Sequence, residues 1–416
     1  MRGTTERQRT IWMLNHYAAA GAQAGGSRHI DLAKSILQQG WRTEIFASSF
    51  DHVSREYVVP TSWRKPVITQ NIDGILVHRV HSSPYFENSW RRYLNMAVFC
   101  FYLLLYCLVR RPKPDVVLGS SGHLLTPMVG WIVARRYRAM CILEVRDLWP
   151  DSLIQLGLTS KPIVAVLRWM ESFLYAHADL IVGVSQGIVA GIIRNGGDPA
   201  KTVLISHGVE TDPSREAVVS QREAIRAELG WRDEFVVLWA GSIEPFNALD
   251  VVIDGAALLD PSLPIKVVLL GGGSEFEALQ QRAATLGNVT MVPSVSRAES
   301  FRWMVAADAG LLVASQFDAF TGTRPRKIFD YMAAHLPILC FVPGEASQIV
   351  AESGAGLVRD WATPHLVAET IAWSVQHASE LDEMGERGAG AAATEYSLEH
   401  SASLLLQYLN TSVQGS

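Results

Sequence analysis

The sequence predicts an α/β protein built from two doubly wound, Rossmann-like domains with parallel sheets. Short apolar runs of strand length alternate with helical patterns along almost the whole chain. The alternation pauses once, in a polar stretch from Glu210 to about Arg222, and then resumes for a similar length. The chain has 416 residues, of which 49% are hydrophobic, so both domains can bury a core. In domains of this kind a ligand binds at the carboxyl ends of the parallel strands.

The first domain is expected to span residues 1–209. Its strands are expected at Thr10–Leu14, Thr43–Ala47, Ile75–Val80, Val116–Gly119, Met140–Val145, Leu180–Val184 and Thr202–Ser206. Its helices are expected at Arg28–Gln39, Leu94–Val109, Leu124–Arg136, Ile163–His177 and Gly187–Asn195.

The second domain is expected over residues 210–396. It begins in the polar stretch, whose Pro213 and low apolar content suit a linker. Its strands are expected at Phe235–Ala240, Ile265–Leu270, Val289–Val292, Gly310–Val313 and Pro337–Phe341. Its helices are expected at Ala248–Leu259, Glu275–Leu286, Ala298–Ala306, Lys327–Ala334, His365–His377 and Ala378–Arg387, and a last helix at Ser397–Leu409 completes the chain.

Composition narrows the function classes. The net charge of -5 argues against binding nucleic acid through bulk electrostatics. The cysteines at 100, 107, 141 and 340 form no CxxC pair, so we expect buried thiols in a reducing compartment, without a disulfide framework or a metal site. The polar N-terminus shows no signal peptide, which favours a cytoplasmic protein.

The longest apolar run is Met96–Val109, flanked by basic residues on both sides. A helix of this length measures about 21 Å, which is short of the ~30 Å hydrocarbon core of a bilayer. Basic and aromatic flanks over residues 91–111 suit a helix lying in a membrane interface, on the cytoplasmic face of an inner membrane. A core helix of an α/β domain explains the same run equally well.

The segment Thr323–Ala334 combines a loop with a basic helix start. Pro325 suits the first position of a helix, and the free N–H groups there attract an anion that Arg324, Arg326 and Lys327 reinforce. Asp330 follows Lys327 by one turn and can accept hydrogen bonds from a hydroxyl beside that anion. A phosphate next to a diol describes a nucleotide, although a plain helix with an ordinary basic first turn fits the segment alone.

Small residues follow several of the expected strands. Gly25 and Gly26 lie in the first strand–helix turn, where they form either a phosphate cradle or a plain turn. In the second domain, the three strand ends hold Gly241 and Ser242, then Gly271–Gly273, then Ser294 and Val295, and consecutive glycines there would make room for a base or phosphate. No GxGxxG fingerprint is present, which disfavours a nicotinamide-dependent dehydrogenase.

Two strand ends of the first domain carry polar side chains. His123 follows Gly119–Gly122 at a helix start, where it is either a hydrogen-bond donor to a sugar hydroxyl or an ordinary capping histidine. The segment Glu144–Asp151 carries four charges beside a Trp-Pro turn, and both acceptor recognition and ion pairing between domains explain them. Its candidate acceptor-side residues are Arg146, Asp147 and Trp149.

These residues together resemble the retaining glycosyltransferases of family 4, which have the GT-B fold. The resemblance is closest to the bacterial cell-surface polysaccharide branch that includes fucosamine-transferase-like enzymes, and it covers essentially the whole chain. The segments that carry it are Gly25–Arg28 with Leu32-Ala33, Val145–Asp151, Val184-Ser185, Ser206–Glu210, Gly271–Gly273 and Pro325–Ala334.

The resemblance implies transfer of a sugar from a nucleotide sugar to a hydroxyl, with retention at the anomeric carbon and with no metal or other cofactor. It implies a donor site in the second domain, an acceptor site in the first, a central cleft between them, and a final helix, over 397–412, that crosses back to the first domain. By position, Asp330 matches the acidic residue that binds the donor ribose, Gly25 and Gly26 match the loop that closes over the diphosphate, and His123 lies near the family's active-site histidine.

Two departures from the family pattern affect the expected site. The family commonly has a Glu eight residues before the ribose-binding acid, where this chain has Gly322, and Asp318 is the nearest replacement. The family also has basic residues after Gly241, where this chain has none. We therefore expect Arg324, Arg326 and above all Lys327 to neutralise the diphosphate, with Lys327 exposed in the free enzyme.

The resemblance thus yields a full set of expected site residues. The candidate catalytic residues are His123, Lys327 and Asp318, and no residue is expected to bind a metal. The candidate donor-binding residues are Gly25, Gly26, Gly241, Ser242, Gly272, Ser294, Val295, Gly322, Thr323, Arg324, Arg326 and Asp330.

The expected reaction moves a hexose or an N-acetylated amino sugar from a UDP-linked donor to a hydroxyl of a lipid-linked glycan. Its place would be the assembly of cell-surface polysaccharide, such as O-antigen, capsule or exopolysaccharide. Two alternatives share the fold: a degenerate, non-catalytic GT-B partner protein, which Gly322 and the missing bases favour, and a nucleotide-sugar 2-epimerase, which would need more carboxylates in its cleft.

Overall fold

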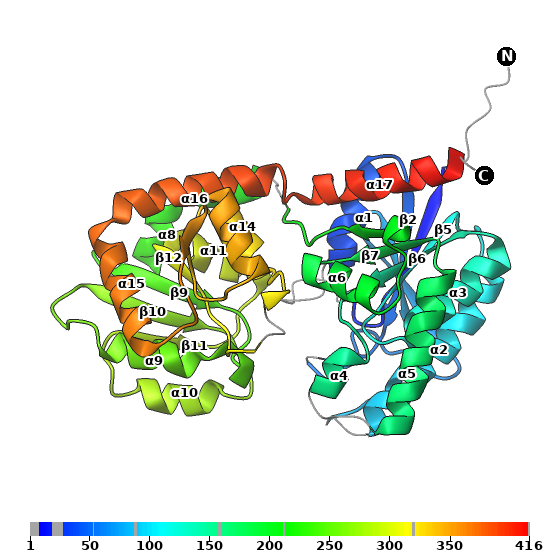
Figure 1. Ribbon diagram of the computed structural model, residues 1–416, viewed down its shortest axis with the longest axis horizontal. Helices are drawn as coiled ribbons and strands as arrows, with labels where there is room; N and C mark the ends of the chain where they lie inside the picture. Colours follow the sequence, from blue (N-terminus) through cyan, green and yellow to red (C-terminus); the bar gives the residue numbers. More distant parts are fainter. Residues whose placement is uncertain are drawn as a thin grey trace, which may run out of the picture. The chain divides into compact units, whose positions relative to one another are not determined.

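The computed structural model describes residues 8–18, 28–52, 54–86, 90–155, 160–210, 213–317 and 321–414. The chain divides into two compact units. The N-terminal unit comprises Met1–Ser206 and Ser401–Ser416, and the C-terminal unit comprises His207–His400. The sequence predicts divisions at 209/210 and 396/397, three to four residues from these. Each unit is a sheet with helices on both faces (Figure 1), as the fold class predicts.

The sheet of the N-terminal unit has eight strands in the order β3-β4-β2-β1-β5-β6-β7-β8. The strands are β1 (Thr10–Leu14), β2 (Arg42–Ser48), β3 (Val67–Ile72), β4 (Ile75–Val80), β5 (Val116–Ser120), β6 (Met140–Val145), β7 (Leu180–Gly183) and β8 (Thr202–Leu204). All pair in parallel except the edge strand β3, which runs antiparallel to β4. Asp73 and Gly74, both with positive φ, form the turn between these two strands.

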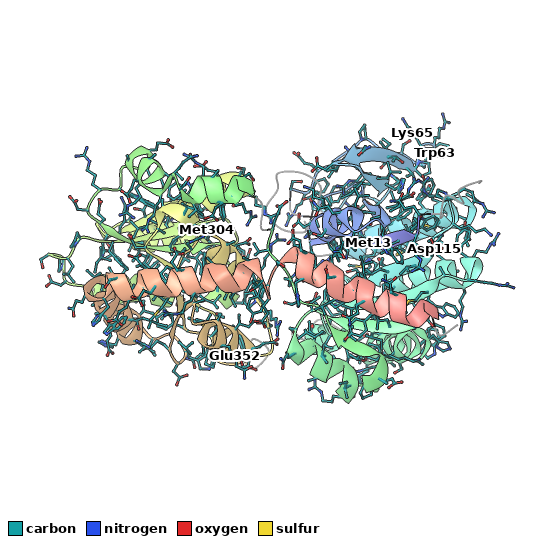
Figure 2. The ribbon with its side chains drawn as sticks, turned by 90° about the horizontal axis from the view of Figure 1, so that it is seen from above. Met13, Trp63, Lys65, Asp115, Met304 and Glu352 are labelled. Carbon is teal, nitrogen blue, oxygen red and sulfur yellow. The ribbon has the colours of Figure 1, made fainter. Side chains whose placement is uncertain are left out.

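Two layers of helices cover this sheet. The helices are α1 (Arg28–Gln38), α2 (Trp90–Val109), α3 (Leu125–Tyr137), α4 (Asp151–Gln155), α5 (Lys161–His177), α6 (Gln186–Arg194) and α17 (Leu398–Gln414). The helix α17 buries Ala402, Leu405 and Leu409 in the same core cluster as β1 and α1. Met13 lies inside this unit, whereas Trp63 and Lys65 lie at its periphery (Figure 2).

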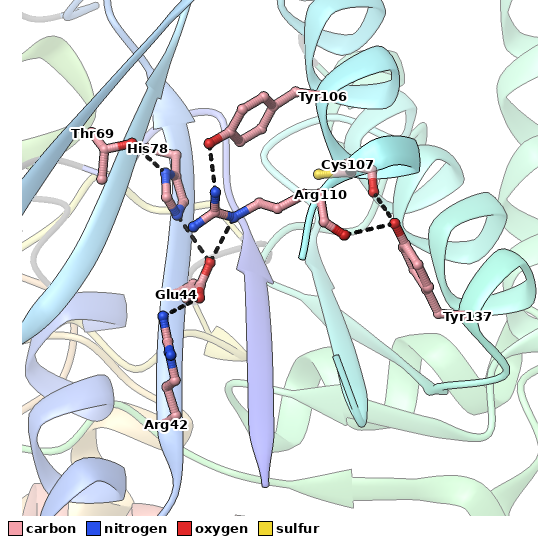
Figure 3. A network of polar contacts seen from close by, with 8 residues as sticks. All are labelled: Arg42, Glu44, Thr69, His78, Tyr106, Cys107, Arg110 and Tyr137. Carbon is pink, nitrogen blue, oxygen red and sulfur yellow. Dashed lines mark hydrogen bonds and ion pairs between the residues drawn. The ribbon is translucent and has the colours of Figure 1, made fainter. Parts of the chain in front are cut away.

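The apolar helix α2 is anchored on the opposite face of the sheet by a polar network at its C-terminal end (Figure 3). The buried Glu44 carboxylate accepts hydrogen bonds from Arg110 Nε at 2.8 Å and contacts His78 Nε2 at 3.0 Å. The Tyr137 hydroxyl lies 2.9 Å from the Cys107 carbonyl oxygen and 3.0 Å from that of Arg110. This network fixes which face of α2 is buried.

The helix α2 has one face expected of a core helix and one face expected of a helix in a membrane interface. One face is core: it buries Asn95, Met96, Phe99, Cys100, Leu103 and Cys107. The other face exposes large apolar side chains, namely Trp90, Tyr93, Leu94, Phe101, Leu105 and Val109. By length and composition alone α2 is long and apolar enough to cross a membrane, but its packed face makes it part of the N-terminal unit.

The sheet of the C-terminal unit is entirely parallel, with six strands in the order β11-β10-β9-β12-β13-β14. The strands are β9 (Phe235–Ala240), β10 (Ile265–Leu270), β11 (Val289–Val292), β12 (Ala309–Leu312), β13 (Ile338–Cys340) and β14 (Gly356–Val358). The side chains of β9 are buried along its whole length, as a central parallel strand requires.

The helices of the C-terminal unit include three that the sequence did not predict. They are α7 (Pro213–Val219), α8 (Arg222–Glu228), α9 (Leu249–Ala257), α10 (Phe276–Ala283), α11 (Arg297–Ala306), α13 (Lys327–Ala333), α14 (Glu345–Ser353), α15 (Pro364–Gln376) and α16 (Ala378–Ala393). The stretch from Glu210 to about Arg222, which the sequence predicts to be a linker, contains the helix α7. The helices α8 and α14 and the strand β14 were not predicted either.

The four cysteines are free and buried, as expected. Burial raises the pKa of the Cys100 and Cys141 thiols to about 12 and that of Cys340 to about 11. These thiols are therefore unreactive core groups at neutral pH.

Candidate functional sites

The C-terminal unit brings the predicted donor-side turns together at the carboxyl ends of β9, β10 and β11. The backbone N–H of Gly241 donates to the Leu270 carbonyl oxygen at 3.0 Å, and that of Gly271 donates to Val292 at 2.9 Å. A Cβ on Gly272 would lie 2.7 Å from Ser294 Oγ. Asn247 Nδ2 donates to the Ser242 carbonyl oxygen at 2.8 Å and so fixes the turn after β9.

The glycines after β10 have a structural reason beyond space for a ligand. A Cβ on Gly271 would lie 1.7 Å from the Gly241 carbonyl oxygen, and one on Gly273 would lie 2.1 Å from that of Ile243. The two loop backbones are therefore in direct contact. Close packing of backbone against backbone accounts for these two positions, whereas the sequence interpretation gave them to a base or phosphate.

Lys327 lies at the same strand ends, with its ammonium directed back against β9. Its Nζ is 2.8 Å from the centroid of the Trp239 ring and 3.0 Å from where a Cβ on Gly241 would stand. The side chain is half-buried, so the expectation of an exposed lysine is wrong. Burial holds the pKa of Lys327 well below its usual range, because the ammonium loses hydration that the aromatic ring replaces only in part.

The helix α13 is held in place by Tyr331, which is fully buried. Its hydroxyl accepts a hydrogen bond from the Ala240 backbone N–H at 3.0 Å, and Gly310 of β12 leaves room for its ring. The helix begins at Lys327, with Arg326 at its cap, so Pro325 precedes the helix and is not its first residue. Tyr331 thus ties the helix that carries Lys327 to the strand that carries Trp239.

The remaining basic residues of this segment are partly engaged within the unit. Arg324 Nε donates to the carboxylate of Glu345, and both side chains are at most 10% exposed. Arg326 Nε lies 3.5 Å from Asp330 Oδ2. A diphosphate would have to open a buried ion pair to use Arg324, whereas the pairing of Arg326 is looser.

For the other predicted donor-side residues, the structure gives either only their position and burial or no description. Gly322 and Thr323 form the turn before α13 and are half-buried, and Val295 is half-buried beyond β11. Gly25, Gly26 and Asp318 fall outside the residues that the structure describes. Glu244, in the position where bases were missing, accepts a hydrogen bond from the Ser274 backbone N–H at 3.2 Å.

In the N-terminal unit, His123 lies two residues before α3 and is only 1% exposed. Its Nε2 is 2.7 Å from Nδ1 of His16, which follows β1, and 3.4 Å from Thr126 Oγ1. Burial, followed by the nearby Arg92 charge, lowers the pKa of His123 to about 3. The imidazole is therefore neutral at physiological pH.

Two of the four charged residues at the end of β6 and after it form ion pairs within the N-terminal unit. Glu144 is 1% exposed and contacts Arg28 Nε at 3.0 Å and His29 Nε2 at 2.9 Å. Arg28 also donates to the carbonyl oxygen of Ile205 at 2.9 Å. Asp151 accepts from Arg168 and, at 2.9 Å, from Asn195 Nδ2. The outer two of the four charges are thus paired within the unit.

The three acceptor-side candidates lie between these paired charges. Asp147 is exposed, while Arg146 and Trp149 are half-buried. The Arg146 backbone N–H donates to Ser121 Oγ at 3.0 Å, which joins the turn after β6 to the turn after β5. These candidates therefore border the turn that carries His123.

Sequence reasoning missed His16 and Tyr331. Tyr331 lies inside the segment already singled out, but its hydroxyl contacts β9, which no local pattern reveals. His16 had a usable signal: it follows β1, and parallel strands bring their carboxyl ends to one edge of the sheet, where His123 also lies.

Comparisons with known proteins match both units of the chain to glycosyltransferase domains. A family model described as a glycosyl transferase 4-like domain matches residues 25–208, and one described as glycosyl transferases group 1 matches residues 234–377. A D-inositol 3-phosphate glycosyltransferase from Jonesia denitrificans is 25% identical over 409 residues, covering 93% of this chain and 91% of its own.

Solved structures show the same fold at low sequence identity. Sucrose-phosphate synthase from Thermosynechococcus elongatus superposes with a TM-score of 0.77 and 16% identity, over 98% of this chain and 100% of its own. Anabaena HepE in complex with UDP-glucose superposes with a TM-score of 0.69 and 15% identity, over 97% and 99% of the two chains.

Proposed function

The chain is a glycosyltransferase with the GT-B fold, and we propose that it transfers a sugar from a nucleoside-diphosphate sugar to a hydroxyl group with retention of configuration. The observation that carries this proposal is the position of Lys327. Its ammonium lies at the glycine-lined end of β9, and the described residues include no carboxylate in contact with it. An incompletely compensated cation at a strand end is suited to an anion such as a diphosphate.

The donor would lie along the strand ends of the C-terminal unit. Lys327 would neutralise charge that develops on the leaving diphosphate, which is the main catalytic task in this reaction. Asp330, one helical turn later, would accept hydrogen bonds from the ribose after exchanging its contact with Arg326. The half-buried Arg326 would then be released toward the phosphates. Gly25, Gly26 and Asp318 keep their proposed donor-side roles.

A front-face displacement suits the carboxylates of the C-terminal unit better than a double displacement. Among the described residues at its strand ends, Glu244 is bound to Ser274 and Asp330 to Arg326. A retaining double displacement needs one free carboxylate as nucleophile and a second as acid and base. We therefore propose that the departing phosphate oxygen accepts the proton of the acceptor hydroxyl, and that no metal ion is required.

For the acceptor we propose a lipid-linked glycan of cell-surface polysaccharide assembly, met at the cytoplasmic face of a membrane. The exposed face of α2 supports this proposal, because its aromatic and aliphatic side chains are 43% to 78% exposed. Residues 90–143 contain eight basic residues and one acidic residue in a chain of net charge -5. An apolar face with basic surroundings suits an interface with anionic lipids.

A second acceptor class has its own support. Three relatives that match 90% to 93% of this chain are named D-inositol 3-phosphate glycosyltransferases, at 25% to 26% identity. Such an acceptor is water-soluble and anionic. Arg146, beside the exposed Asp147, is the described N-terminal residue that we would test for it.

A thermal-shift screen with UDP, GDP, ADP and their sugar conjugates, each with and without EDTA, tests the donor proposal. A ligand that binds only the folded form raises the melting temperature. We expect one nucleoside diphosphate, UDP, to raise it equally with and without EDTA. The absence of any shift would favour the non-catalytic partner, and release of a free epimer without an acceptor would favour the 2-epimerase.

A vesicle-binding assay separates the two acceptor classes. We expect the protein to co-sediment with anionic vesicles, and the double variant Phe101→Asp/Leu105→Asp to remain folded and lose that binding. Leu258→Asp, at an exposed leucine of the C-terminal unit, is the matched control and should still bind. Equal binding by all three proteins, or none by the wild type, would direct the assays to inositol phosphate.

A further inference from the structure

The buried histidines His16 and His123 are joined by a hydrogen bond that can fix the tautomer of His123. We call this pair the histidine relay. Both rings are at most 3% exposed, and a 2.7 Å contact between nitrogens can only be a hydrogen bond, since two bare nitrogens would repel each other. One nitrogen carries the hydrogen and the other accepts it. Which nitrogen does so determines what the second nitrogen of His123 can offer a substrate.

The partners of His16 determine the direction of that bond. Asn95, on α2, donates one of its two amide N–H groups to the Ser83 carbonyl oxygen, and its own oxygen can accept a hydrogen bond. Asn95 also hydrogen-bonds the His16 side chain and raises its pKa, as an acceptor does. Because Nδ1 of His16 is taken by His123, the hydrogen that Asn95 accepts is on Nε2.

The rest of the relay follows from one proton per neutral ring. With hydrogen on Nε2, the Nδ1 of His16 is an acceptor, and the hydrogen of the 2.7 Å bond belongs to Nε2 of His123. The Nδ1 of His123 then carries a lone pair. This atom is buried and has no hydrogen-bond partner among the described residues.

The His16 ring is fixed so that it cannot exchange roles by rotating. It stacks on Phe99 of α2 with ring centroids 4.3 Å apart, and on Tyr17 with centroids 4.6 Å apart and the two planes 2° from parallel. The edge-on contact with His123 is set at 89° by the same packing. Flipping His16 would break its bonds to Asn95 and His123 together.

We infer that His16 is a positioning residue, which holds His123 in the Nε2–H tautomer and presents its Nδ1 lone pair as a hydrogen-bond acceptor for a substrate hydroxyl. This inference rests on the proposed function for the identity of the hydroxyl, which belongs to the donor sugar or the acceptor. The tautomer itself rests only on the contacts within the N-terminal unit. In this arrangement His123 accepts, rather than donates, a hydrogen bond from the sugar.

Nitrogen NMR of the histidine side chains tests the relay without any substrate. In protein labelled with ¹⁵N-histidine, long-range correlations distinguish a protonated from a bare ring nitrogen, and His123→Gln identifies the signals of residue 123. We expect protonated Nε2 and bare Nδ1 on His123. His16→Phe keeps the stacked ring but removes the acceptor, and should shift the His123 signals toward the other tautomer. A proton on Nδ1 in the wild type, or unchanged signals in His16→Phe, would overturn the inference.

His16→Asn provides the rescue, because its amide oxygen can take the place of Nδ1 as the acceptor. We expect His16→Phe to lower kcat by about 10²-fold, the usual scale of a mispositioned acid–base group, while His16→Asn stays within about tenfold of the wild type. The His78 signals, set by Glu44 and Thr69, report whether each variant is folded. Equal loss of kcat in both variants would assign His16 to packing alone. If no donor yields turnover, the proposed function fails while the tautomer result still stands.

Discussion

The two units of this protein treat polar groups at their strand ends in opposite ways. In the N-terminal unit, charged side chains at the strand ends are neutralised by one another: Glu144 is bound by Arg28 and His29. In the C-terminal unit, the strand ends consist of glycine backbone, and the ammonium of Lys327 lies against an aromatic ring without a carboxylate in the described residues. The first arrangement stabilises the fold, whereas the second leaves capacity for a ligand.

This difference corrects a simple inference from charge. Four charges near β6 suit either acceptor recognition or ion pairing between domains when only the sequence is read, and the structure pairs two of them within the N-terminal unit. A single lysine in α13 is the stronger candidate because its hydration is lost and incompletely replaced. What matters is whether the fold already supplies a counter-charge.

Removing the charge of Glu144 should have the largest effect on stability among the changes that test this difference between the units. Glu144→Gln keeps the shape but leaves Arg28 buried without its anion, and we expect the free energy of unfolding to fall by about 3–5 kcal/mol. Urea denaturation measures this change. Asp73→Asn, in the exposed pair with Lys34, is the control in the same unit and should change stability by less than about 0.5 kcal/mol. Similar losses in both variants would mean that the Glu144 network is no more than a surface pair.

Replacing Lys327 by Met should have the opposite profile. The thioether can pack on Trp239 without carrying a desolvated charge, so we expect unchanged or higher stability. Turnover should fall by roughly 10²–10³-fold, as when one group that stabilises a transition-state charge is lost. The measurements are a thermal melt and kcat with the donor found by the thermal-shift screen.

Lys266→Met, at a half-buried lysine in β10, is the control for the loss of a positive charge in the same unit and should leave kcat unchanged. If Lys327→Met retained full turnover, the proposed neutralisation of the diphosphate would be wrong. If it lost stability, the ammonium would have a partner that the strand-end geometry does not reveal.

The contact between the glycine-containing loops after β9 and β10 can be tested by adding a methyl group to one of them. Gly271→Ala places a methyl group against the Gly241 carbonyl oxygen, and we expect a loss of roughly 1–3 kcal/mol in the free energy of unfolding. Gly287→Ala has no atom within 4 Å of the added carbon and should be close to neutral. Denaturant midpoints compare the two. Equal stability would show that the loops after β9 and β10 separate easily, which would favour the original interpretation of open space for a ligand.

Most of the fold could be predicted from the sequence because buried parallel strands are continuous apolar runs. The bounds of β1, β6, β9, β10 and β11 match the predictions. The strand β3 was missed because an antiparallel edge strand alternates apolar and polar residues, and VITQNI holds few apolar ones. The strand β14 was missed because it has only three residues.

The candidate site was less predictable because its chemistry depends on contacts between distant segments. The segment Thr323–Ala334 indicated Lys327 and Asp330, but the burial of Lys327 depends on Trp239, 88 positions earlier in the chain. The packing of Gly271 on Gly241 joins two loops in the same way. Local patterns name the residue types at a site, while their partners and pKa values follow only from the folded chain.

The smallest expected effect concerns the buried pair His16 and His123, which should make the stability of the N-terminal unit depend on pH. Burial and the nearby Arg92 lower the pKa of His123 to about 3, and burial, then His123, lowers that of His16 well below its usual value. Below pH ~6.5 the unfolded chain binds protons that the folded chain refuses, so the free energy of unfolding falls as the pH falls, by about 1.4 kcal/mol per pH unit for each such histidine. His16→Phe removes one of these groups, and urea denaturation at pH 7 and pH 5 should therefore show a smaller loss than in the wild type. An identical loss would mean that His16 is protonated in the folded state, which a relay of neutral rings does not allow.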